Sequence, residues 1–376
     1  MGMGEPETGY CEYTGPVARR TRSGDNETVN TLRLIVNPRQ LETDEAGESL
    51  DRAAAILRAG GLVALPTETV YGLGANALDR TAVGRIFAAK SRPAWDPIIV
   101  HVASEAMLEG LVVEVPAAAR RLMKHFWPGP LTLLLPRAFA VPDAVTAGRP
   151  LVGVRIPSHP VAFELIRRAQ VPVAAPSANR FGHISPTTAQ HVLDDLDGRI
   201  DAILDAGPSP GGVESTVLDP TKMVIYRPGA VTLEQIREVA GPVEMYRDAG
   251  ALRETPEQAL PSPGVGIRHY APRARLVLVE APLKELETRL AEIARGIDEE
   301  RVGLMLPEGV ARPAAIAEER VFSWGRWNAP EELAQRLYAG LRALDAAGCT
   351  VILCPLPAAE GIGAAIRDRL QKAGTK

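Results

Sequence analysis

The stretch PTETVYGLG, residues 66–74, follows a short apolar run, Leu62–Leu65, that is long enough for one buried strand. Pro66 cannot donate a hydrogen bond to a sheet ladder, so we expect the strand to end there. Residues 67–69 then present two hydroxyls and a carboxylate at the carboxyl end of the strand. Ligands of open α/β sheets bind at that end. The glycines at 72 and 74 favour a tight return and a close backbone approach.

A helical pattern over Asp79–Ala89 comes next and leads into KSRP, residues 90–93. Lys90 and Arg92 are two cations at a helix exit, and cations in this arrangement suit an anion such as a nucleotide phosphate. Taken alone, such a pair is more often a solvated helix end that interacts favourably with the helix dipole. The case for a binding site therefore rests on what recurs downstream.

The same construction, an apolar strand followed by proline and polar side chains, recurs through the first two thirds of the chain. Each repeat places hydroxyl, amide or guanidinium groups near a strand end, so we expect these groups to converge on one cleft. The segments are LVGVRIPSHP (151–160), APSAN (175–179), GGVESTV (211–217) and YRPGA (226–230).

Short apolar runs alternate with helical stretches, which predicts an α/β protein. The expected strands are Leu62–Leu65, Ile98–Val102, Leu131–Leu135, Val152–Ile156, Val171–Ala174, Ala202–Leu204, Thr216–Leu218, Leu276–Val279, Val302–Leu306 and Thr350–Leu353. The expected helices are Asp51–Ala59, Asp79–Ala89, Ala117–Phe126, Pro160–Ala169, Pro186–Leu193, Leu283–Arg295 and Glu331–Ala347, with one more opened by a capping box at Thr232 and Gln235.

Four regions are expected. Residues 1–45 form an N-terminal tail, poorly ordered at its start, and residues 46–241 form the main domain. Residues 242–273 form a proline-rich linker or lid, and residues 274–376 form a smaller, Rossmann-like domain with a parallel sheet.

Net charge, cysteine spacing and apolar run length argue against several classes of protein. Residues 1–50 and the whole chain both carry a net charge of −4, so the remainder is neutral. A neutral body argues against stable nucleic-acid binding. Three cysteines give neither a disulfide framework nor a CxxC metal pair, and no apolar run is long enough for a membrane span. We expect a cytoplasmic protein with no membrane attachment.

Familiar catalytic motifs are missing from the sequence. There is no GxxxxGK[ST] loop and no HExxH pair, and the glycines at 72 and 74 lack the acidic partner of a dinucleotide site. No Ser/His/Asp order is compelling, and no cysteine lies near the cleft segments. Covalent catalysis is therefore not indicated.

In this order, PTETVYGLG, KSRP, LVGVRIPSHP, APSAN, GGVESTV and YRPGA resemble the threonylcarbamoyl-AMP synthases. The resemblance implies a YrdC-like, twisted mixed-sheet catalytic domain over about residues 48–240. SPGVGIRHYAP (262–272) and the C-terminal unit resemble the long, two-domain form of the family. The family's KxR and SxN signature is met by Lys90, Arg92, Ser177 and Asn179.

The resemblance implies a nucleotidyltransferase that makes threonylcarbamoyl-AMP and pyrophosphate from L-threonine, bicarbonate or CO2, and ATP, with magnesium. The product would pass to a transferase that modifies tRNA. Lys90 and Arg92 would be catalytic, and threonine would be held by Thr69, His101, Arg155 and Ser215. ATP would be held by Lys90, Arg92, Asp96, Leu151, Ala175, Ser177, Asn179, Ser185, Arg227 and Tyr270. The resemblance assigns no metal-ligating residue.

Three positions depart from the family pattern: Asp96 stands where Asn is usual, Leu151 replaces a common Thr, and Gly266 stands where Lys is common. An extra carboxylate near polyphosphate repels it unless magnesium intervenes. Two alternative functions are weighed against synthesis. One is a double-stranded-RNA-binding or ribosome-associated protein, which the neutral body disfavours. The other is a carbamoyl-adenylate-dependent carbamoyltransferase, whose acylphosphatase and zinc-finger units have no counterpart here.

Overall fold

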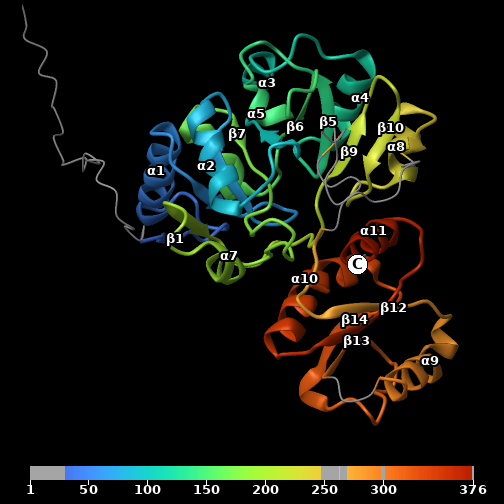
Figure 1. The fold of residues 1–376 in the computed structure, drawn as a ribbon. Helices are drawn as coiled ribbons and strands as arrows, with labels where there is room; N and C mark the ends of the chain where they lie inside the picture. The colour runs from blue at the N-terminus through green and yellow to red at the C-terminus, as the bar shows by residue number, and fades with distance from the viewer. Residues whose placement is uncertain (1–29, 247–261, 263–268, 298–300, 375–376) are drawn as a thin grey trace, which may run out of the picture.

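The computed structural model describes residues 30–246, 262, 269–297 and 301–374. Two α/β units are visible in Figure 1, one coloured blue to yellow and the other orange to red. Residues 1–29 of the expected tail, 1–45, and most of the expected linker, residues 247–261 and 263–268, lie outside the described residues. Within the rest of that tail, Leu32–Ile35 form a strand that pairs with Ala202–Asp205 of the first unit.

An eleven-stranded mixed sheet organises the first unit, as the family resemblance implies. Its strand order is β1-β8-β2-β3-β7-β4-β6-β5-β9-β10-β11. The strands are β1 (Leu32–Ile35), β2 (Val63–Leu65), β3 (Gly72–Asn76), β4 (Ile99–His101), β5 (Leu131–Pro136), β6 (Leu151–Arg155), β7 (Val173–Ala174), β8 (Ala202–Asp205), β9 (Thr216–Asp219), β10 (Val224–Arg227) and β11 (Glu244–Met245).

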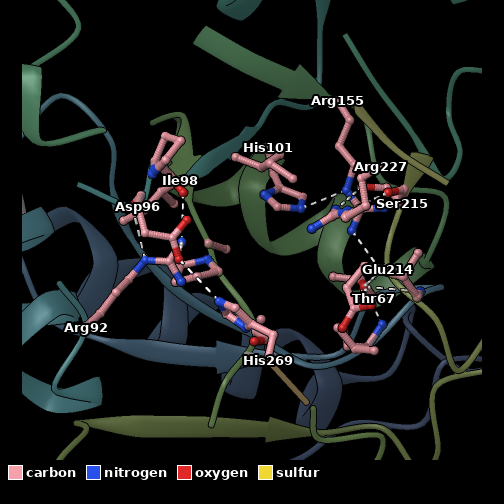
Figure 2. A pocket seen from close by; sticks show the side chains of 18 of the residues that line it. Thr67, Arg92, Asp96, Ile98, His101, Arg155, Glu214, Ser215, Arg227 and His269 are labelled. Carbon is pink, nitrogen blue, oxygen red and sulfur yellow. Dashed lines mark hydrogen bonds and ion pairs between the residues drawn. The ribbon is translucent and has the colours of Figure 1, made fainter. Parts of the chain in front are cut away.

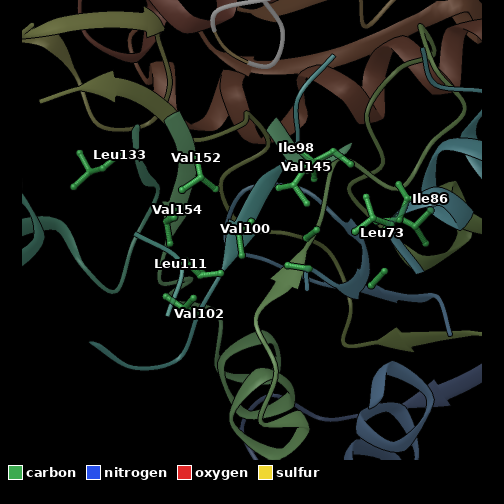
Figure 3. Close-up of a cluster of buried hydrophobic side chains, with 14 of the residues drawn as sticks. Leu73, Ile86, Ile98, Val100, Val102, Leu111, Leu133, Val145, Val152 and Val154 are labelled. Carbon is green, nitrogen blue, oxygen red and sulfur yellow. The ribbon is translucent and has the colours of Figure 1, made fainter. Parts of the chain in front are cut away.

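Helices cover both faces of this sheet because its strands are apolar on both sides. In the run around β2, Val63 and Leu65 pack on one face, and Leu62 and Ala64 pack on the other. The first face is covered by α1 (Asp44–Arg58) and α6 (Pro160–Ala169). The second face holds the larger core, part of which Figure 3 shows. Its helices are α2 (Arg80–Lys90), α4 (Ala117–Phe126), α7 (Ala189–Leu196) and α8 (Leu233–Ala240), and the short helices α3 (Glu105–Glu109) and α5 (Asp143–Thr146) also pack there.

Three expectations for the first unit need correction. The helix expected over Pro186–Leu193 is α7, which begins at Ala189 because the Thr188 side chain caps it by accepting from the His191 N–H. Helix α1 begins at Asp44 rather than Asp51, because the Thr43 side chain caps it by accepting from the Ala46 N–H. The glycines at 72 and 74 lie in a strand, β3, which pairs antiparallel with β2. A Cβ at Gly74 would lie 2.8 Å from Val173, so glycine here permits close packing.

A second, four-stranded sheet is wholly parallel, as expected, with the order β12-β15-β13-β14. One face is covered by α9 and the other by α10 and α11. The elements are β12 (Arg275–Val279), α9 (Leu283–Arg295), β13 (Val302–Glu308), η1 (Glu318–Arg320), β14 (Val321–Arg326), α10 (Pro330–Ala346), β15 (Val351–Pro355) and α11 (Ile362–Gly374).

Helices α10 and α11 lie between the second sheet and the first unit (Figure 1). Val70, Ile184 and Val213 of the first unit belong to the same buried apolar cluster as these two helices. The approach is close: a Cβ at Gly212 would lie 2.2 Å from the Ala334 carbonyl oxygen of α10. Among the described residues, no helix is both long and apolar enough to cross a bilayer.

Candidate active site

One pocket in the first unit gathers the ends of several strands (Figure 2). Loop 66–71 follows β2, His101 ends β4, Arg155 ends β6 and Arg227 ends β10. The convergence expected from the repeated strand-proline pattern is therefore present. The pocket is lined by Thr67, Thr69, Val70, Gly72, Arg92, Asp96, Pro97, Ile98, Ile99, His101, Arg155, Ala175, Pro176, Ser177, Glu214, Ser215, Arg227, His269 and Tyr270.

Arg155 organises one side of the pocket. Its side chain is buried and donates from Nε to His101 Nε2 at 2.8 Å, from Nη2 to Thr69 Oγ1 at 3.1 Å, and from Nη1 to Glu68 Oε1 at 2.5 Å. Because His101 Nε2 accepts a hydrogen bond, that imidazole is neutral. Burial, and then the neighbouring Arg155 cation, hold the pKa of His101 well below its usual value.

Ser215 and Arg227 continue this wall. Arg227 donates from Nε to the Ser215 carbonyl at 3.1 Å and from Nη2 to Ser215 Oγ at 3.1 Å. The same hydroxyl is 2.8 Å from Thr132 Oγ1. The four residues expected to bind threonine, Thr69, His101, Arg155 and Ser215, thus all line one pocket.

Arg92 and Asp96 form a buried ion pair on the opposite side of Figure 2, with Nη2 and Oδ2 2.9 Å apart. His269 Nε2 lies 3.6 Å from the same carboxylate oxygen. Burial alone would raise the pKa of Asp96, but Arg92, His269 and Lys90 together outweigh it and lower that pKa overall. Asp96 accepts no side-chain hydrogen bond from the described residues.

Lys90 does not line the pocket. Its side chain is buried, and Nζ donates to the carbonyl of Ser177 at 2.6 Å and to that of Asn179. Burial, with Arg92 nearby, lowers the pKa of Lys90 well below its usual value. The KxR lysine therefore holds the SxN loop, while the arginine reaches the pocket.

Three other residues expected to hold ATP also lie outside the pocket lining. The Asn179 amide donates to the carbonyls of Arg180 and His183. Ser185 Oγ donates to Glu214 Oε1 at 2.6 Å. Leu151 packs beside Ile99 in a small apolar cluster. The backbone N–H at Ala175, which does line the pocket, is already bonded to the Ile99 carbonyl at 2.9 Å.

Tyr270 both lines the pocket and packs against the second unit. Its ring stacks on Tyr338 of α10 with centroids 5.8 Å apart, and the Arg369 guanidinium of α11 lies 5.3 Å from its ring centre. Tyr270, expected at the ATP site, is therefore also a contact between the two units.

Glu214 is a pocket residue that the sequence interpretation did not single out. Its carboxylate accepts from Ser185, from the Tyr338 hydroxyl at 2.9 and 3.1 Å, and from Arg369 Nε at 2.7 Å. Burial would raise its pKa, but Arg369 and then Arg227 lower that pKa to about 2. Glu214 stands in the GGVESTV motif beside Ser215, but its main partner is 155 positions away, and no local pattern indicates that pairing.

Both units of this chain match families of known proteins. Residues 55–229 match the Sua5/YciO/YrdC family model, described as telomere recombination. Residues 231–375 match the model of the threonylcarbamoyl-AMP synthase C-terminal domain. The threonylcarbamoyl-AMP synthase of Pyrococcus abyssi is 44% identical over 85% of this chain and 92% of its own length. The chain belongs to the threonylcarbamoyl-AMP synthase family.

Other members of the threonylcarbamoyl-AMP synthase family agree with this assignment. The Bacillus subtilis enzyme is 43% identical over 88% of this chain and 95% of its own length. The crystal structure of P. abyssi Sua5 complexed with L-threonine superposes with a TM-score of 0.83 at 41% identity, covering 92% of this chain and 98% of that one. The two-unit fold is thus shared with a solved two-domain family member.

Proposed function

We propose that this chain is an L-threonylcarbamoyladenylate synthase, which forms threonylcarbamoyl-AMP and pyrophosphate from L-threonine, bicarbonate or CO2, and ATP. The observation that carries the proposal is a single pocket whose lining holds three arginines with buried side chains and several hydroxyls but no cysteine. Joining a carboxylated amine to a nucleotide needs positioning and charge neutralisation rather than a covalent enzyme intermediate.

We assign threonine to the side of the pocket formed by Thr69, His101, Arg155 and Ser215. An arginine has five N–H donors, and three of those on Arg155 are engaged by the contacts described above. The two that remain can bind the substrate carboxylate. Neutral His101 fixes the plane of the guanidinium, and the hydroxyls of Thr69 and Ser215 offer partners for the threonine amine and hydroxyl.

We assign the phosphates of ATP to Arg92, Arg227 and Ser177 in the pocket lining, and we expect Tyr270 to cover the nucleotide. Guanidinium groups suit phosphate oxygens because they present paired donors in a fixed plane. Lys90, Asn179 and Ser185 act indirectly in this assignment, by holding the loops that carry pocket residues. Ala175 would contribute its remaining backbone group, and Leu151 would contribute apolar packing alone.

Magnesium would enter with ATP rather than occupy a cage built by the protein. Among the described residues there is no cluster of three metal-ligating side chains. Mg²⁺ commonly uses one or two carboxylates together with substrate phosphates. Asp96 fits that role, because its buried oxygens accept no side-chain hydrogen bond and it stands beside Arg92. The ion would supply charge neutralisation on the phosphates.

In this scheme the pocket brings a threonine carbamate to the α-phosphate of ATP. A carbamate oxygen bonds to phosphorus, and the bond from phosphorus to the bridging oxygen of pyrophosphate breaks. Arg92 and Arg227 stabilise the negative charge that develops on the phosphate oxygens. The product would leave for a tRNA-modifying transferase, and we expect the reaction to take place in the cytoplasm.

The test is pyrophosphate release by the purified chain with ATP and magnesium, with threonine and bicarbonate each supplied or withheld. We expect release to require both, and AMP to appear in a threonine-containing product. Equal release without threonine would overturn the proposal. Release that needs bicarbonate but not threonine would favour carbamoyl transfer, and retention of duplex RNA at physiological salt would favour an RNA-binding function.

A further inference from the structure

A carboxylate in the wall of this pocket presents an electrostatic problem. Glu214 lines the pocket, its side chain is 9% exposed, and its low pKa keeps it ionised at neutral pH. The ligand assigned to this pocket, ATP, is strongly anionic. An uncompensated carboxylate in a water-poor wall would repel it, because charges interact strongly at low dielectric.

Two of the three side chains that donate to Glu214 come from the other unit. Tyr338 reaches it from α10 and Arg369 from α11, while Ser185 belongs to the first unit. The Arg369 side chain is only 1% exposed, and it also donates to the Pro228 carbonyl at 3.0 Å, next to Arg227. The second unit thus completes the wall of the pocket.

The same two residues hold Tyr270. Its ring lies against both the Tyr338 ring and the Arg369 guanidinium. Tyr270 has φ +63°, a left-handed backbone conformation that is strained for a non-glycine residue. Tertiary contacts must therefore stabilise it. The side-chain contacts that α10 and α11 provide fulfil this requirement.

We propose that Arg369 is a positioning residue for ATP binding: it neutralises and orients the Glu214 carboxylate and supports Tyr270, so the pocket accepts an anion only when the second unit is docked. This inference rests on the proposed function, which identifies the anion as ATP. It assigns the C-terminal unit a direct part in the electrostatics of the site.

The test measures the dissociation constant of ATP by calorimetry, without threonine so that no turnover occurs. We expect Arg369→Met to weaken ATP binding by at least about tenfold, since a buried carboxylate is then left unpaired. Adding Glu214→Gln to that variant removes the negative charge and should restore affinity to within about threefold. Rescue of this kind is expected from an electrostatic role, whereas a purely structural contact would be further damaged by losing Glu214.

Arg367→Met is the matched control, because Arg367 lies on the same helix but pairs with Glu280 of its own unit at 2.6 Å. Its ATP affinity should be unchanged. If Arg369→Met does not fold, Tyr338→Phe removes one donor to Glu214 and keeps the ring; it should give a smaller loss with the same rescue. A double variant that binds ATP no better than its parent single variant, Arg369→Met or Tyr338→Phe, would overturn the proposal.

The two proposals of this section and the last can fail separately. If the wild-type chain binds ATP but releases no pyrophosphate in response to threonine, the proposed function is wrong and the Arg369 test still applies. Wild-type chain that binds no ATP overturns both.

Discussion

The Lys90 ammonium and the Arg92 guanidinium are two positions apart in the sequence and have different surroundings. Lys90 donates to carbonyls of the SxN loop, whereas Arg92 pairs with Asp96 in the pocket wall. The KxR motif alone does not show that the two cations have different partners. The difference arises because α2 ends at Lys90, before Arg92. Ser91, with φ +54°, turns the chain so that Lys90 is buried and Arg92 reaches the pocket.

Substitutions at these two positions should therefore behave differently. Lys90→Met leaves two loop carbonyls without their donor, and we expect a loss of about 2–5 kcal/mol in unfolding free energy together with loss of synthesis. Arg92→Gln combined with Asp96→Asn removes both members of an ion pair, but the backbone carbonyls of Asp96 and Pro97 also lose their Arg92 donor, so we expect a loss of about 1–3 kcal/mol in unfolding free energy. ATP binding by the double variant should fall by at least about tenfold, if Arg92 holds phosphate.

Denaturant unfolding and ATP calorimetry on the same samples check this prediction. Asp96→Asn alone is the reference, because asparagine keeps an oxygen at that place. If the double variant binds ATP as tightly as Asp96→Asn does, then Arg92 serves only to neutralise Asp96.

At the residue scale, the sequence identified side chains that act within local motifs. Thr69, His101, Arg155 and Ser215 were each expected at the site, and each lines the pocket. Glu214 was not singled out because its meaning depends on Arg369, and long-range pairings of this kind leave no trace in local spacing. The roles of Thr69, His101, Arg155 and Ser215 in binding threonine remain proposals.

At the scale of elements, strong local signals were enough to predict the bounds of several helices from the sequence. Helices α4, α6 and α9 begin and end where the apolar period and flanking residues predicted, and the Thr232–Gln235 capping box is present. Strands β1, β3, β10, β11 and β14 were missed. They are short, exposed at a sheet edge, or rich in glycine, so their pairing depends on tertiary neighbours rather than on propensity.

The loop of residues 207–212 connects β8 to β9 within the first unit and contacts α10 of the second unit, which allows a prediction at this scale. Gly207 and Gly212 both have positive φ, +80° and +72°. A Cβ at Gly207 meets nothing within 4 Å, but one at Gly212 meets the backbone of α10. Gly207→Ala should cost about 1 kcal/mol from backbone strain alone, and Gly212→Ala should cost about 1–3 kcal/mol more by pushing α10 away.

Thermal unfolding of the two variants gives this difference directly, since Gly207 is the matched control. Hydrogen exchange should also quicken in α10 of the Gly212 variant. Equal destabilisation of the two variants would mean that the contact between the loop and α10 contributes nothing to stability.

At the scale of the whole molecule, the alternation of strands and helices predicted two α/β units and the parallel second sheet. It did not predict how they dock. That depends on Val70, Ile184 and Val213, three apolar residues in three separate loops. The members of their cluster on α10 and α11 are more than 100 positions later in the chain. The docking is nevertheless what brings Tyr338 and Arg369 to the pocket.

The histidines make stability depend on pH over the whole molecule. Burial lowers the pKa of His101, His159, His191 and His269, to about 4 for His159 and His191. Between pH 6.5 and about 4 the unfolded chain binds protons at these imidazoles that the folded chain excludes. Their contribution is therefore fully present above pH 6.5 and is lost as the pH falls towards 4. The Glu214 contribution, with a pKa of about 2, is lost only below pH 4.5.

We therefore expect the free energy of unfolding to fall between pH 7 and pH 5, before the carboxylates of Glu214 and Asp96 are protonated. His159 is 8% exposed and should account for about 2 kcal/mol of that fall at pH 5. His159→Gln should remove this share of the slope in urea unfolding at the two pH values. His125→Gln, at an exposed position on α4, should leave the slope unchanged. A His159 variant with the wild-type slope would show that His159 is protonated as readily in the folded chain as in the unfolded one.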